Sequence, residues 1–397
     1  MKGFRTLEQA DVKGKRVLLR VDLNVPIQDG VVSDATRIER MAPTILQIAD
    51  RGGMVILLSH LGRPKGPNPK DSLKPIAAET ARVIARPVAF VDDCIGPKAE
   101  AAALAMKPGD ILCLENTRFH TGEEKNDPAF AAALARLGDI WVNDAFSVSH
   151  RAHASTEGLG HILPAYAGPA MKAELAAFNR VLDAPERPLA AIVGGAKVST
   201  KLELLGALIQ KVNVLIIGGG MANTFLAAQG KDVGKSLCEH NLAGTARDIL
   251  LQATARNCEI VLPIDAVTAR RFEANAPSRV TSVDDLDADE MILDVGPRTV
   301  EHVVSVLGRV KTLVWNGPFG AFEMQPFDTG TIEIAEAAAE LTAAGKIVSV
   351  AGGGDTVAAL NAAGTTDRMT YVSAAGGAFL EWLEGKPLPG VQVLRQK

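Results

Sequence analysis

Aromatic residues are scarce in this chain of 397 residues, where they make up 4%. Proteins that hold single-stranded nucleic acid stack its bases on aromatic side chains, so the scarcity argues against such a surface. An excess of one charge is also missing, since 42 Lys and Arg face 46 Asp and Glu. DNA-binding and membrane-surface proteins usually carry a strongly basic balance. We therefore expect no nucleic-acid partner and no membrane partner, and any anion site must come from basic residues placed locally.

Long hydrophobic runs are absent as well. No run reaches the length of a membrane-spanning helix, and the N-terminus MKGFRTLEQADVKGK has no apolar signal segment. The four cysteines, Cys94, Cys113, Cys238 and Cys258, form no CxxC pair and show no metal-ligand spacing with histidine. Three of them lie in or beside apolar runs, where buried structural thiols are expected. These absences predict a soluble protein of the reducing cytoplasm.

Two common nucleotide motifs, GxxxxGK[ST] and GxGxxG, are missing too, which disfavours ordinary P-loop enzymes and simple dinucleotide enzymes. Two other glycine-rich segments are present: LAAIVGGAKVSTK, Leu189 to Lys201, and KIVSVAGGGDT, Lys346 to Thr356. In each, an apolar run breaks into glycines and then presents polar or cationic groups at an expected helix start. Glycines let the backbone approach a ligand, and free N–H groups at a helix start attract anions. The two segments indicate a nucleotide site.

Length and hydrophobic pattern together predict the fold. The chain is too long for one ordinary core, so two domains are expected. Short apolar runs without clean alternation, typical of parallel strands covered on both faces, alternate with Ala- and Leu-rich helical stretches. The expected strands lie near residues 17–25, 54–59, 88–91, 111–114, 140–143, 190–193, 214–217, 259–262, 291–293, 312–315, 347–350 and 370–373. With roughly six strands in each half, the chain is predicted to be α/β, with two doubly wound parallel-sheet (Rossmann-like) domains.

The domain boundary is expected at the helical segment MKAELAAFNRVLD, Met171 to Asp183. The proline-bearing APERP follows it, and its prolines would stop the helix and set the start of the next strand. The two domains are therefore predicted to be joined by a hinge helix.

Ligands of doubly wound sheets bind beyond the carboxyl ends of the strands. In the first half, polar residues recur at these positions: Asp22, Asn24, Arg37, His60, Arg63, Arg118 and Arg151. The planar fork of arginine suits both phosphate and carboxylate, so these residues indicate a site for a small phosphorylated carboxylate. Each residue taken alone also has a plainer explanation. A loop arginine is usually solvated or salt-bridged, His60 would serve as a hydrogen-bonded structural residue, and Asp22 and Asn24 would shape a turn.

In the second half, Lys197 and Lys201 are four residues apart, so they share one face if a helix runs from Val198. Two lysines on a solvated turn explain the spacing equally well. The segment Gly352–Asp355 offers backbone donors and a carboxylate able to hold Mg²⁺, or else a tight turn with Asp355 as N-cap. Gly218–Gly220 and Gly376–Gly377 repeat the pattern, and packing would also explain them.

Nine segments together resemble the phosphoglycerate kinase family: RVDLNVP, SHLGRP, LENTRFH, NDAF…HRAH, GGAKVSTK, GGGMANTF, VWNGPFGAFE, GGGDT and LEGKPLPGV. They follow the family's order and spacing over essentially the whole chain. The resemblance implies a phosphotransferase of glycolysis with a carboxyl group as acceptor. Residues 1–170, with the tail 376–397, would bind 3-phosphoglycerate or 1,3-bisphosphoglycerate. Residues 171–375 would bind Mg·ADP or Mg·ATP.

The resemblance also implies residue roles. The seven residues named above in the first half, from Asp22 to Arg151, would hold the triose acid. Arg37 and Lys197 would supply cations to the transferring phosphoryl group, with N–H groups of Gly353, Gly354 and Gly377. The nucleotide would be held by Lys201, Asn316, Pro318, Glu323, Gly353, Gly354, Asp355 and Thr356. Among these, Glu323 would bind the ribose, Asn316 and Pro318 would line the base pocket, and Asp355 would hold Mg²⁺. Such an enzyme is expected to be a monomer that transfers the group in line after hinge closure.

The chain departs from the family pattern at two places. It has Ser147, Val148 and Ser149 where the family usually reads GTA. It also has Ala374 and Ala375 where Thr and Gly are usual, with Phe379 in place of Ser. The lost hydroxyl at 374 puts one contact near the transferring phosphate in doubt.

Two other functions stay open. A nicotinamide-dependent dehydrogenase acting on a small acid would need a glycine motif followed by an acidic ribose ligand, a pair that is not convincingly present. A catalytically silent nucleotide-binding or scaffold protein would be expected to lack the cations at the transfer point. Arg37 and Lys197 are both in place.

Overall fold

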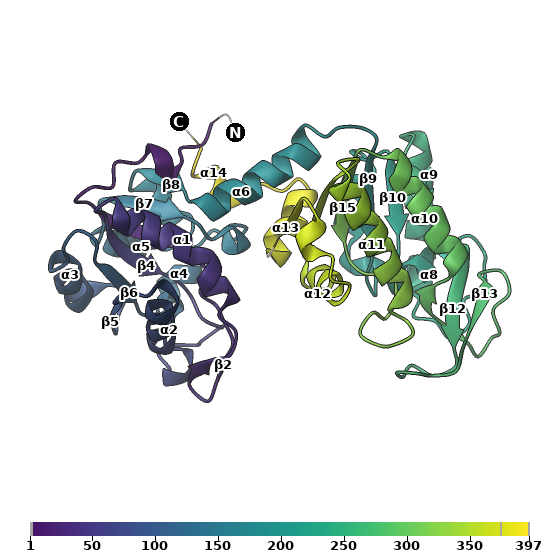
Figure 1. Ribbon diagram of the computed structural model, residues 1–397, viewed down its shortest axis with the longest axis horizontal. Coiled ribbons are helices and arrows are strands. Elements are labelled where there is room, and N and C mark those ends of the chain that lie inside the picture. Colours follow the sequence, from purple (N-terminus) through teal and green to yellow (C-terminus); the bar gives the residue numbers. More distant parts are fainter. Residues whose placement is uncertain (1–2, 374, 396–397) are drawn as a thin grey trace. The chain divides into compact units, whose positions relative to one another are not determined.

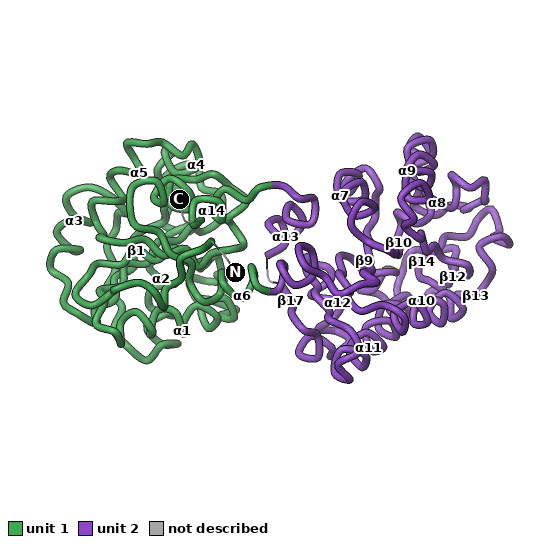
Figure 2. The backbone as a smooth tube through the Cα atoms, turned by 90° about the horizontal axis from the view of Figure 1, so that it is seen from above, with its two compact units in different colours: residues 1–176, 387–397 green, residues 177–386 purple. Residues whose placement is uncertain are grey.

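The chain divides into two units after Ala176 and again after Lys386 in a computed structural model that describes residues 3–373 and 375–395. Unit 1 comprises Met1–Ala176 and Pro387–Lys397, and unit 2 comprises Ala177–Lys386 (Figure 2). The sequence placed these divisions at residues 170 and 375. Residues 376–386 belong to unit 2 rather than to unit 1, because Phe379 packs its ring 5.3 Å from that of Phe178 in that unit.

Unit 1 is built on a six-stranded sheet in which all neighbours are parallel, in the order β5-β6-β4-β1-β7-β8. A two-stranded antiparallel hairpin, β2-β3, is separate from it. The strands are β1 (Arg16–Arg20), β2 (Ile27–Gln28), β3 (Val31–Val32), β4 (Met54–Leu58), β5 (Ala89–Val91), β6 (Ile111–Leu114), β7 (Ile140–Asn143) and β8 (Ala165–Ala167). The central β1 pairs with β4 and β7, so the loops after these three strands emerge at one edge of the sheet.

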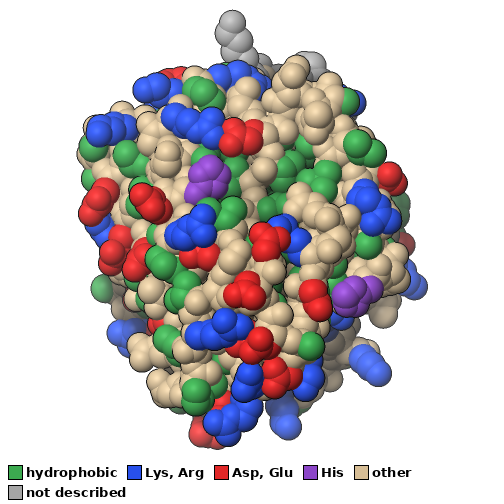
Figure 3. Space-filling view, turned by 90° about the vertical axis from the view of Figure 1, so that its right-hand side faces the viewer, with side chains coloured by type: hydrophobic (Ala, Val, Ile, Leu, Met, Phe, Trp, Pro, Cys, Tyr) green, Lys and Arg blue, Asp and Glu red, His purple; other side chains and the backbone are tan. Residues whose placement is uncertain are grey.

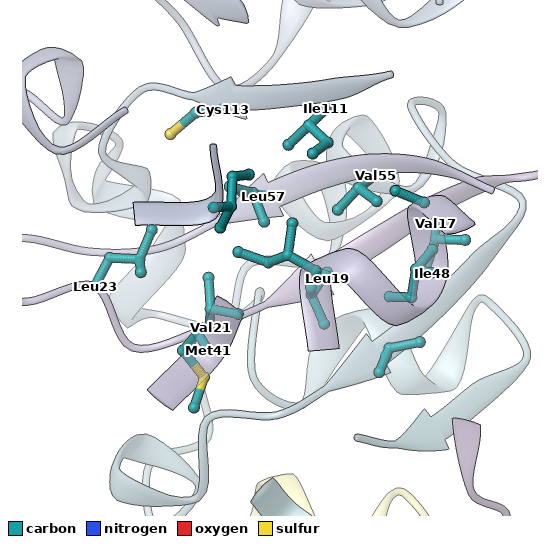
Figure 4. Packing of buried hydrophobic residues seen from close by; sticks show 14 of the residues in the cluster. Val17, Leu19, Val21, Leu23, Met41, Ile48, Val55, Leu57, Ile111 and Cys113 are labelled. Carbon is teal, nitrogen blue, oxygen red and sulfur yellow. The ribbon is translucent and has the colours of Figure 1, made fainter. Parts of the chain in front are cut away.

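The helices of unit 1 lie mainly in the connections between its strands. They are α1 (Thr36–Asp50), α2 (Lys74–Ile84), α3 (Gly96–Leu104), α4 (Thr121–Glu124), α5 (Pro128–Ala135) and α14 (Pro389–Gln392), while α6 (Pro169–Phe178) leads into unit 2 (Figure 1). Helix α1 buries a stripe at helical spacing, Ile38, Met41, Ile45 and Ile48. The stripe belongs to one core cluster with Val17, Leu19, Val55 and Leu57 of the strands, and Figure 4 shows Met41 and Ile48 of the stripe in this cluster.

Unit 2 repeats the plan with a second six-stranded parallel sheet, in the order β11-β10-β9-β15-β16-β17. Its strands are β9 (Leu189–Val193), β10 (Val214–Ile217), β11 (Glu259–Val261), β15 (Thr312–Asn316), β16 (Val348–Gly352) and β17 (Tyr371–Ser373). The chain runs outward from β9 to β11 and then returns to β15 and runs the other way. The strand order therefore reverses between β9 and β15, where a doubly wound sheet opens its ligand crevice.

The helices of unit 2 pack as two groups, with α8 against α9 and α10 against α11 (Figure 1). The helices are α7 (Leu202–Leu208), α8 (Gly219–Ala228), α9 (Ala243–Ala255), α10 (Pro297–Arg309), α11 (Thr329–Ala343), α12 (Gly354–Ala362) and α13 (Gly376–Leu383). Helix α10 buries Val300, Val303, Val306 and Leu307, a stripe at the spacing that its sequence shows.

The predicted fold class, α/β with two doubly wound parallel sheets, is confirmed. The strand expected at residues 291–293 exists, but it belongs to a small antiparallel sheet, β13-β12-β14, rather than to the main sheet. Its strands are β12 (Asp265–Ala269), β13 (Ser278–Ser282) and β14 (Met291–Val295). The strand expected over residues 17–25 ends at Arg20. Strands β2, β3, β8, β12 and β13 were not expected, because they are short or carry too few apolar residues for a clear pattern.

Short 3-10 turns and one π-helical turn complete the chain. They are Leu7–Gln9, Pro69–Asp71, Thr117–Phe119, Phe146–Val148, Gly158–His161, Asn179–Asp183 (π), Val198–Thr200, His240–Leu242 and Thr366–Arg368. Within the described residues, none of the helices is both long enough and apolar enough to cross a membrane. On the face shown in Figure 3, Lys and Arg side chains are mixed with Asp and Glu. Local placement therefore decides where anions can bind, as the composition predicted.

Candidate functional site

A cluster of basic side chains occupies the edge of the first sheet where its strands end. The loops after β1, β4, β6 and β7 carry six of the seven residues predicted for the phosphorylated acid, and Arg37 lies in the first turn of α1. The structure brings most of these predicted residues together at one edge of the sheet. It also adds Arg20 and His153 to the cluster. Arg20 ends strand β1 inside an apolar run, and a cation in such a run is a sequence signal for a buried polar site.

Arg20 is the buried centre of this cluster, with 1% of its surface exposed. Its Nε donates to Ser155 Oγ at 2.9 Å, and its Nη2 lies 3.2 Å from Nδ1 of His60. Because arginine has donors only, His60 Nδ1 must accept this bond, which leaves the ring proton on Nε2. His60 is therefore neutral and offers an N–H donor.

Asp22 and Asn24 fix the loop after β1. Asp22 Oδ2 accepts hydrogen bonds from Arg37 Nη1 at 2.8 Å and from Ser147 Oγ at 2.5 Å. Asn24 Oδ1 accepts from the Gly62 backbone N–H at 3.0 Å. Ser147, one of the departures from the family pattern, thus adds a second hydrogen bond to the carboxylate oxygen that orients Arg37. The hydrogen bonds of Asp22 and Asn24 shape the loop after β1.

The remaining arginines differ in how they are held. Arg118 is buried, and its Nη1 donates to the Gly62 carbonyl at 2.6 Å while its Nε lies 3.1 Å from Glu124. Arg151 Nε donates to His150 Nε2 at 3.2 Å, and Arg63 is exposed. Of the cluster's arginines, only Arg37 and Arg118 have a carboxylate of the described residues at ion-pair distance. The cluster keeps a surplus of positive charge that an anionic ligand would neutralise.

The histidines of the cluster are held neutral. Burial, followed by the charges of Arg118, Arg20 and Arg151, lowers the pKa of His153 to about 4. Burial and Arg151 lower the pKa of His150 to about 4, and burial with Arg20 lowers the pKa of His60 well below its usual value. Neutral imidazoles add hydrogen-bonding groups without adding to the repulsion among the arginines.

These shifts predict a loss of stability in acid. A histidine whose pKa is lower in the folded chain stabilises the fold fully above about pH 6.5, and its contribution is lost as the pH falls from there towards 4. We therefore expect the thermal midpoint to fall over this window, and His153→Gln should make that fall shallower. His302→Gln, at an exposed histidine of α10, is the matched control and should follow the wild type. A wild-type midpoint that stays flat from pH 7 to pH 4.5 would contradict the argument.

In unit 2, the ends of β9 and β15 are tied together by Lys201. Its Nζ donates to Gly194 O at 2.5 Å, to Asn316 O at 3.3 Å and to Asn316 Oδ1 at 2.7 Å. Burial lowers the pKa of Lys201 to about 8, against an opposing effect of Asp355. All three ammonium protons are directed at protein acceptors, so Lys201 positions the strand ends. Asn316 Nδ2 also donates to Gly352 O at 2.7 Å, so the Asn316 side chain links the end of β15 to the end of β16.

Lys197 behaves differently from Lys201. It precedes the 3-10 turn Val198–Thr200, and α7 begins only at Leu202, so no continuous helix joins the two lysines. The expectation that they share one helical face is wrong, because the 3-10 turn breaks the spacing of four residues. Lys197 is exposed, and within the described chain its ammonium has no hydrogen-bond or ion-pair partner.

The GGGD segment makes a strand–turn–helix junction at the end of β16. Gly353 is the N-cap of α12 with φ +100°, and a Cβ there would lie 2.6 Å from Asn316 Nδ2, so only glycine fits. Asp355 lies in the first turn and is exposed, so it is not the N-cap that the alternative reading supposed. Thr356 is buried and accepts a hydrogen bond from Gly317 N at 2.7 Å. The junction leaves Gly354 and Asp355 open to a ligand.

A cavity of about 500 Å³ adjoins these strand ends. Pro318, Glu323 and Asp355 line it, as the sequence predicted for a nucleotide site, whereas Asn316, Gly353 and Thr356 do not. Its apolar walls were not predicted from the sequence; they are formed by Leu237, Phe272, Met291, Ile292, Leu293, Phe319 and Phe322. Phe272 is 64% exposed and Leu237 is 50% exposed. A flat ring system bound in the cavity could pack against these exposed apolar side chains. Much of this wall comes from β14, which belongs to the small antiparallel sheet. That sheet was not predicted, so its residues were not expected at the cavity.

Asp294 forms part of the same wall and is nearly fully buried. Burial raises its pKa to about 8, although the backbone N–H groups of Gly330 and Val295 donate to its carboxyl oxygens at 2.8 Å. The group is therefore largely protonated at neutral pH, so the wall presents little negative charge to an anionic ligand.

The second departure from the family pattern is partly explained by packing. Phe379 packs against Phe178, and its ring would meet a Cβ on Gly352 at 2.5 Å, so it closes the space beside the end of β16. Ala375 is buried, and its N–H donates to Ser373 Oγ at 3.1 Å. Gly377 is exposed in the first turn of α13. Ala374 lies outside the described residues.

Known proteins resemble this chain along its whole length. The phosphoglycerate kinase family model matches residues 7–386. The chain is 65% identical over 396 residues to the phosphoglycerate kinase of Rhodopseudomonas palustris, covering 100% of both. It is 64% identical over 394 residues to that of Bradyrhizobium diazoefficiens, covering 99% of both.

Solved structures agree with this. The structure of phosphoglycerate kinase from Coxiella burnetii matches with a TM-score of 0.92 and 42% identity over 98% of each chain. That from Pyrococcus horikoshii matches with a TM-score of 0.83 and 28% identity, again over 98% of each. Family model, relatives and structures all cover both units, so the chain belongs to the phosphoglycerate kinase family.

Proposed function

We propose that this chain catalyses the reversible, Mg²⁺-dependent transfer of a phosphoryl group between 1,3-bisphosphoglycerate and ADP, which yields 3-phosphoglycerate and ATP. The observation that carries the proposal is the surplus of cations in unit 1, where several arginines surround neutral histidines at the carboxyl edge of a parallel sheet. A phosphorylated carboxylate has the charge and the planar acceptors that such a cluster would bind.

Unit 1 would bind the triose acid. The proposed ligands are Asp22, Asn24, Arg37, His60, Arg63, Arg118 and Arg151. Arg20 would hold the His60 ring in place through its hydrogen bond to Nδ1. The surplus positive charge of the arginines supports binding of the phosphate and carboxylate, and the Nε2 proton of His60 offers a further hydrogen bond.

Unit 2 would bind the nucleotide. The apolar cavity that includes Leu237 and Phe272 suits the base, with Pro318 on its wall, and Glu323 at its rim would bind the ribose hydroxyls. Gly353, Gly354, Asp355 and Thr356 at the start of α12 would lie at the phosphates, where free N–H groups favour anions. Lys201 and Asn316 would support this site by holding the strand ends.

Asp355 fits the magnesium of the nucleotide complex. Its carboxylate is exposed in the first turn of α12, and among the described residues it has no hydrogen-bond or ion-pair partner. Mg²⁺ in phosphoryl-transfer enzymes is commonly held by one or two carboxylates together with phosphate oxygens, and it neutralises the charge of those oxygens when bound.

The chemistry requires cations rather than a general base. In the direction of ATP use, a carboxylate oxygen of 3-phosphoglycerate attacks the γ-phosphorus. A new O–P bond forms, the bond to the β–γ bridging oxygen breaks, and ADP leaves with that electron pair. The nucleophile carries no proton, so none has to be removed. Arg37 and Lys197 would stabilise the charge spread over the transferring group, with the N–H groups of Gly353, Gly354 and Gly377.

The direct test is a coupled assay in which ATP and 3-phosphoglycerate are supplied and the 1,3-bisphosphoglycerate formed is reduced by a dehydrogenase with NADH. Turnover that needs Mg²⁺ and disappears in Arg37→Ala would support the proposal. A protein that binds both ligands by calorimetry without turnover would instead be a silent binder. NADH oxidation without the coupling dehydrogenase would indicate the nicotinamide-dependent alternative.

Arg63→Ala should weaken binding of 3-phosphoglycerate by about 10- to 100-fold, since a hydrogen bond to a charged group contributes roughly 1.5–3 kcal/mol. Calorimetric titration with each ligand checks this. Arg82→Ala, which removes an exposed arginine paired with Glu79 in the same unit, is the control and should bind like the wild type. If Arg63→Ala altered only nucleotide affinity, the assignment of ligands to units would be reversed.

The partners are proposed to be these small molecules alone. A monomer located in the cytoplasm is the prediction for assembly and location, and analytical ultracentrifugation of the purified chain tests the first of these.

A further inference from the structure

Three side chains of different chemistry meet beside a second cavity in unit 1. Asp93, Cys94 and His120 each present a metal-ligand atom, and these three atoms all lie within 4.8 Å of one another. The cavity that they line has a volume of about 510 Å³. Neither the proposed triose-acid ligands nor the proposed nucleotide ligands include these residues.

The sheet explains why residues 26 positions apart come together. Asp93 and Cys94 lie in the turn between β5 and α3, and His120 follows the 3-10 turn after β6. Strands β5 and β6 are parallel neighbours, with Val91 opposite Leu114, so their following loops emerge at the same edge. Linear spacing of cysteine and histidine therefore gave no sign of the cluster in the sequence.

Hydrogen bonds already hold the oxygen and nitrogen atoms in place. Asp93 Oδ1 accepts from the backbone N–H groups of Cys94 at 2.7 Å and Ile95 at 3.3 Å. The same oxygen lies 2.8 Å from His120 Nε2. The His120 ring stacks on Phe130, with 5.2 Å between centroids, which fixes its plane. A proton now lies between imidazole and carboxylate, at a place that a metal ion can take.

The other carboxylates of the cavity are occupied. Asp92 forms an ion pair with Lys98 at 2.8 Å. Glu115 accepts hydrogen bonds from Ser72 Oγ at 2.6 Å and from the backbone N–H groups of Leu73 and Asn116. The cluster therefore offers one sulfur, one nitrogen and one oxygen ligand, and the open cavity leaves room for water as a fourth.

The charges around Cys94 favour a cation. The carboxyl group of Asp93 adjoins it in the chain, Glu115 directly follows β6, and Glu123 lies in α4. Carboxylates attract a divalent ion, and thiolate, imidazole and carboxylate are the ligands that zinc takes in proteins.

We propose that Asp93, Cys94 and His120 form a Zn²⁺ site with three protein ligands and a water molecule in the fourth position. On binding, the thiol of Cys94 releases its proton to solvent and a zinc–sulfur bond forms. The proton on His120 Nε2 moves through solvent to Nδ1, so the ring stays neutral, and the ion takes its place beside Asp93. The ion thereby joins the turn after β5 to the loop that carries Arg118, two residues before His120.

The test uses the full chain after treatment with a chelator. Zn²⁺ is titrated in competition with a chromophoric chelator, and Co²⁺ is added separately to record the thiolate-to-cobalt charge-transfer absorption. We expect one ion per chain, a sulfur-to-cobalt band, and a thermal midpoint that rises with Zn²⁺. Cys94→Ser and His120→Gln should each weaken Zn²⁺ binding by about 100-fold or more, because changes to mere outer-shell partners already cost 10- to 100-fold.

Two controls separate this site from others. Cys258→Ser removes a buried thiol of unit 2, and His161→Gln removes a histidine that is likewise paired with a carboxylate, Glu157. Both should bind Zn²⁺ like the wild type. The proposal is overturned if Cys94→Ser, shown to be folded by circular dichroism, binds Zn²⁺ as tightly as the wild type. It is overturned equally if the wild type binds none, or if the Co²⁺ complex lacks the sulfur band.

Discussion

Replacing Lys197 with alanine is expected to reduce kcat by about 100- to 1,000-fold while ADP still binds, the cost typical of losing one preorganised donor to a transition state. The structure distinguishes Lys197 from Lys201, because the ammonium group of Lys201 donates its hydrogen bonds to Gly194 and Asn316. Lys197 follows the glycine pair at the end of β9, is exposed, and has no partner among the described residues. Its charge is therefore available to a ligand.

Steady-state kinetics with calorimetric ADP binding checks this prediction. Lys346→Ala is the matched control, because Lys346 is an exposed lysine that precedes β16, at the opposite edge of the same sheet. It should leave kcat unchanged. Unaltered kcat in Lys197→Ala would remove this lysine from the mechanism, and an equal loss of ADP affinity would make it a binding residue instead.

Gly194→Ala is expected to lower the free energy of unfolding by about 3 kcal/mol or more. This is the upper end of the values typical of an overpacked core. A Cβ on Gly194 would lie 1.9 Å from the carbonyl oxygen of Pro318 and 2.8 Å from Gly317 C. Both neighbours are backbone atoms, so no side-chain rotation relieves the clash. Gly317 is itself held at φ +106°, directly after β15. The two strand ends at the switch point are in direct backbone contact, and the Lys201 side chain links them as well.

Denaturant unfolding measures the effect, and ADP titration should show weakened binding, because Gly195 and Pro318 line the cavity proposed for the nucleotide. Gly206→Ala is the control: Gly206 lies inside α7 with open space where its Cβ would be. That change should stabilise the chain by up to about 1 kcal/mol through helix propensity. Equal unfolding midpoints for Gly194→Ala and the wild type would refute the packing argument.

The main sheets could be predicted because their strands are buried on both faces. Continuous apolar runs such as those of β4 and β9 have no other stable placement, and the glycines after them mark the ligand edge. The antiparallel strand β13 could not be predicted this way, since its sequence SRVTS is mostly exposed. A strand with one open face and few apolar residues has no distinctive pattern.

The candidate sites were predictable to the extent that they follow the strands. Asp22 and Arg118 come directly after apolar runs, so the topology that brings strand ends together also brings these residues together. Direction of the side chain was not predictable, as Lys197 and Lys201 show, because one 3-10 turn decides which of them faces solvent. The meeting of Cys94 with His120 depended on the pairing of β5 with β6, which linear spacing does not encode.

The C-terminal segment of unit 1 has a consequence for synthesis. Gly390 O accepts a hydrogen bond from Asn143 Nδ2, and Arg395 bridges to Phe4, so residues 387–395 complete a unit begun some hundreds of residues earlier. Unit 2 is continuous from Ala177 to Lys386 and is translated in full before them. The chain of unit 2 is therefore complete before that of unit 1. The surface of unit 1 that receives Gly390 stays uncovered until residues 387–395 have been made and have left the ribosome.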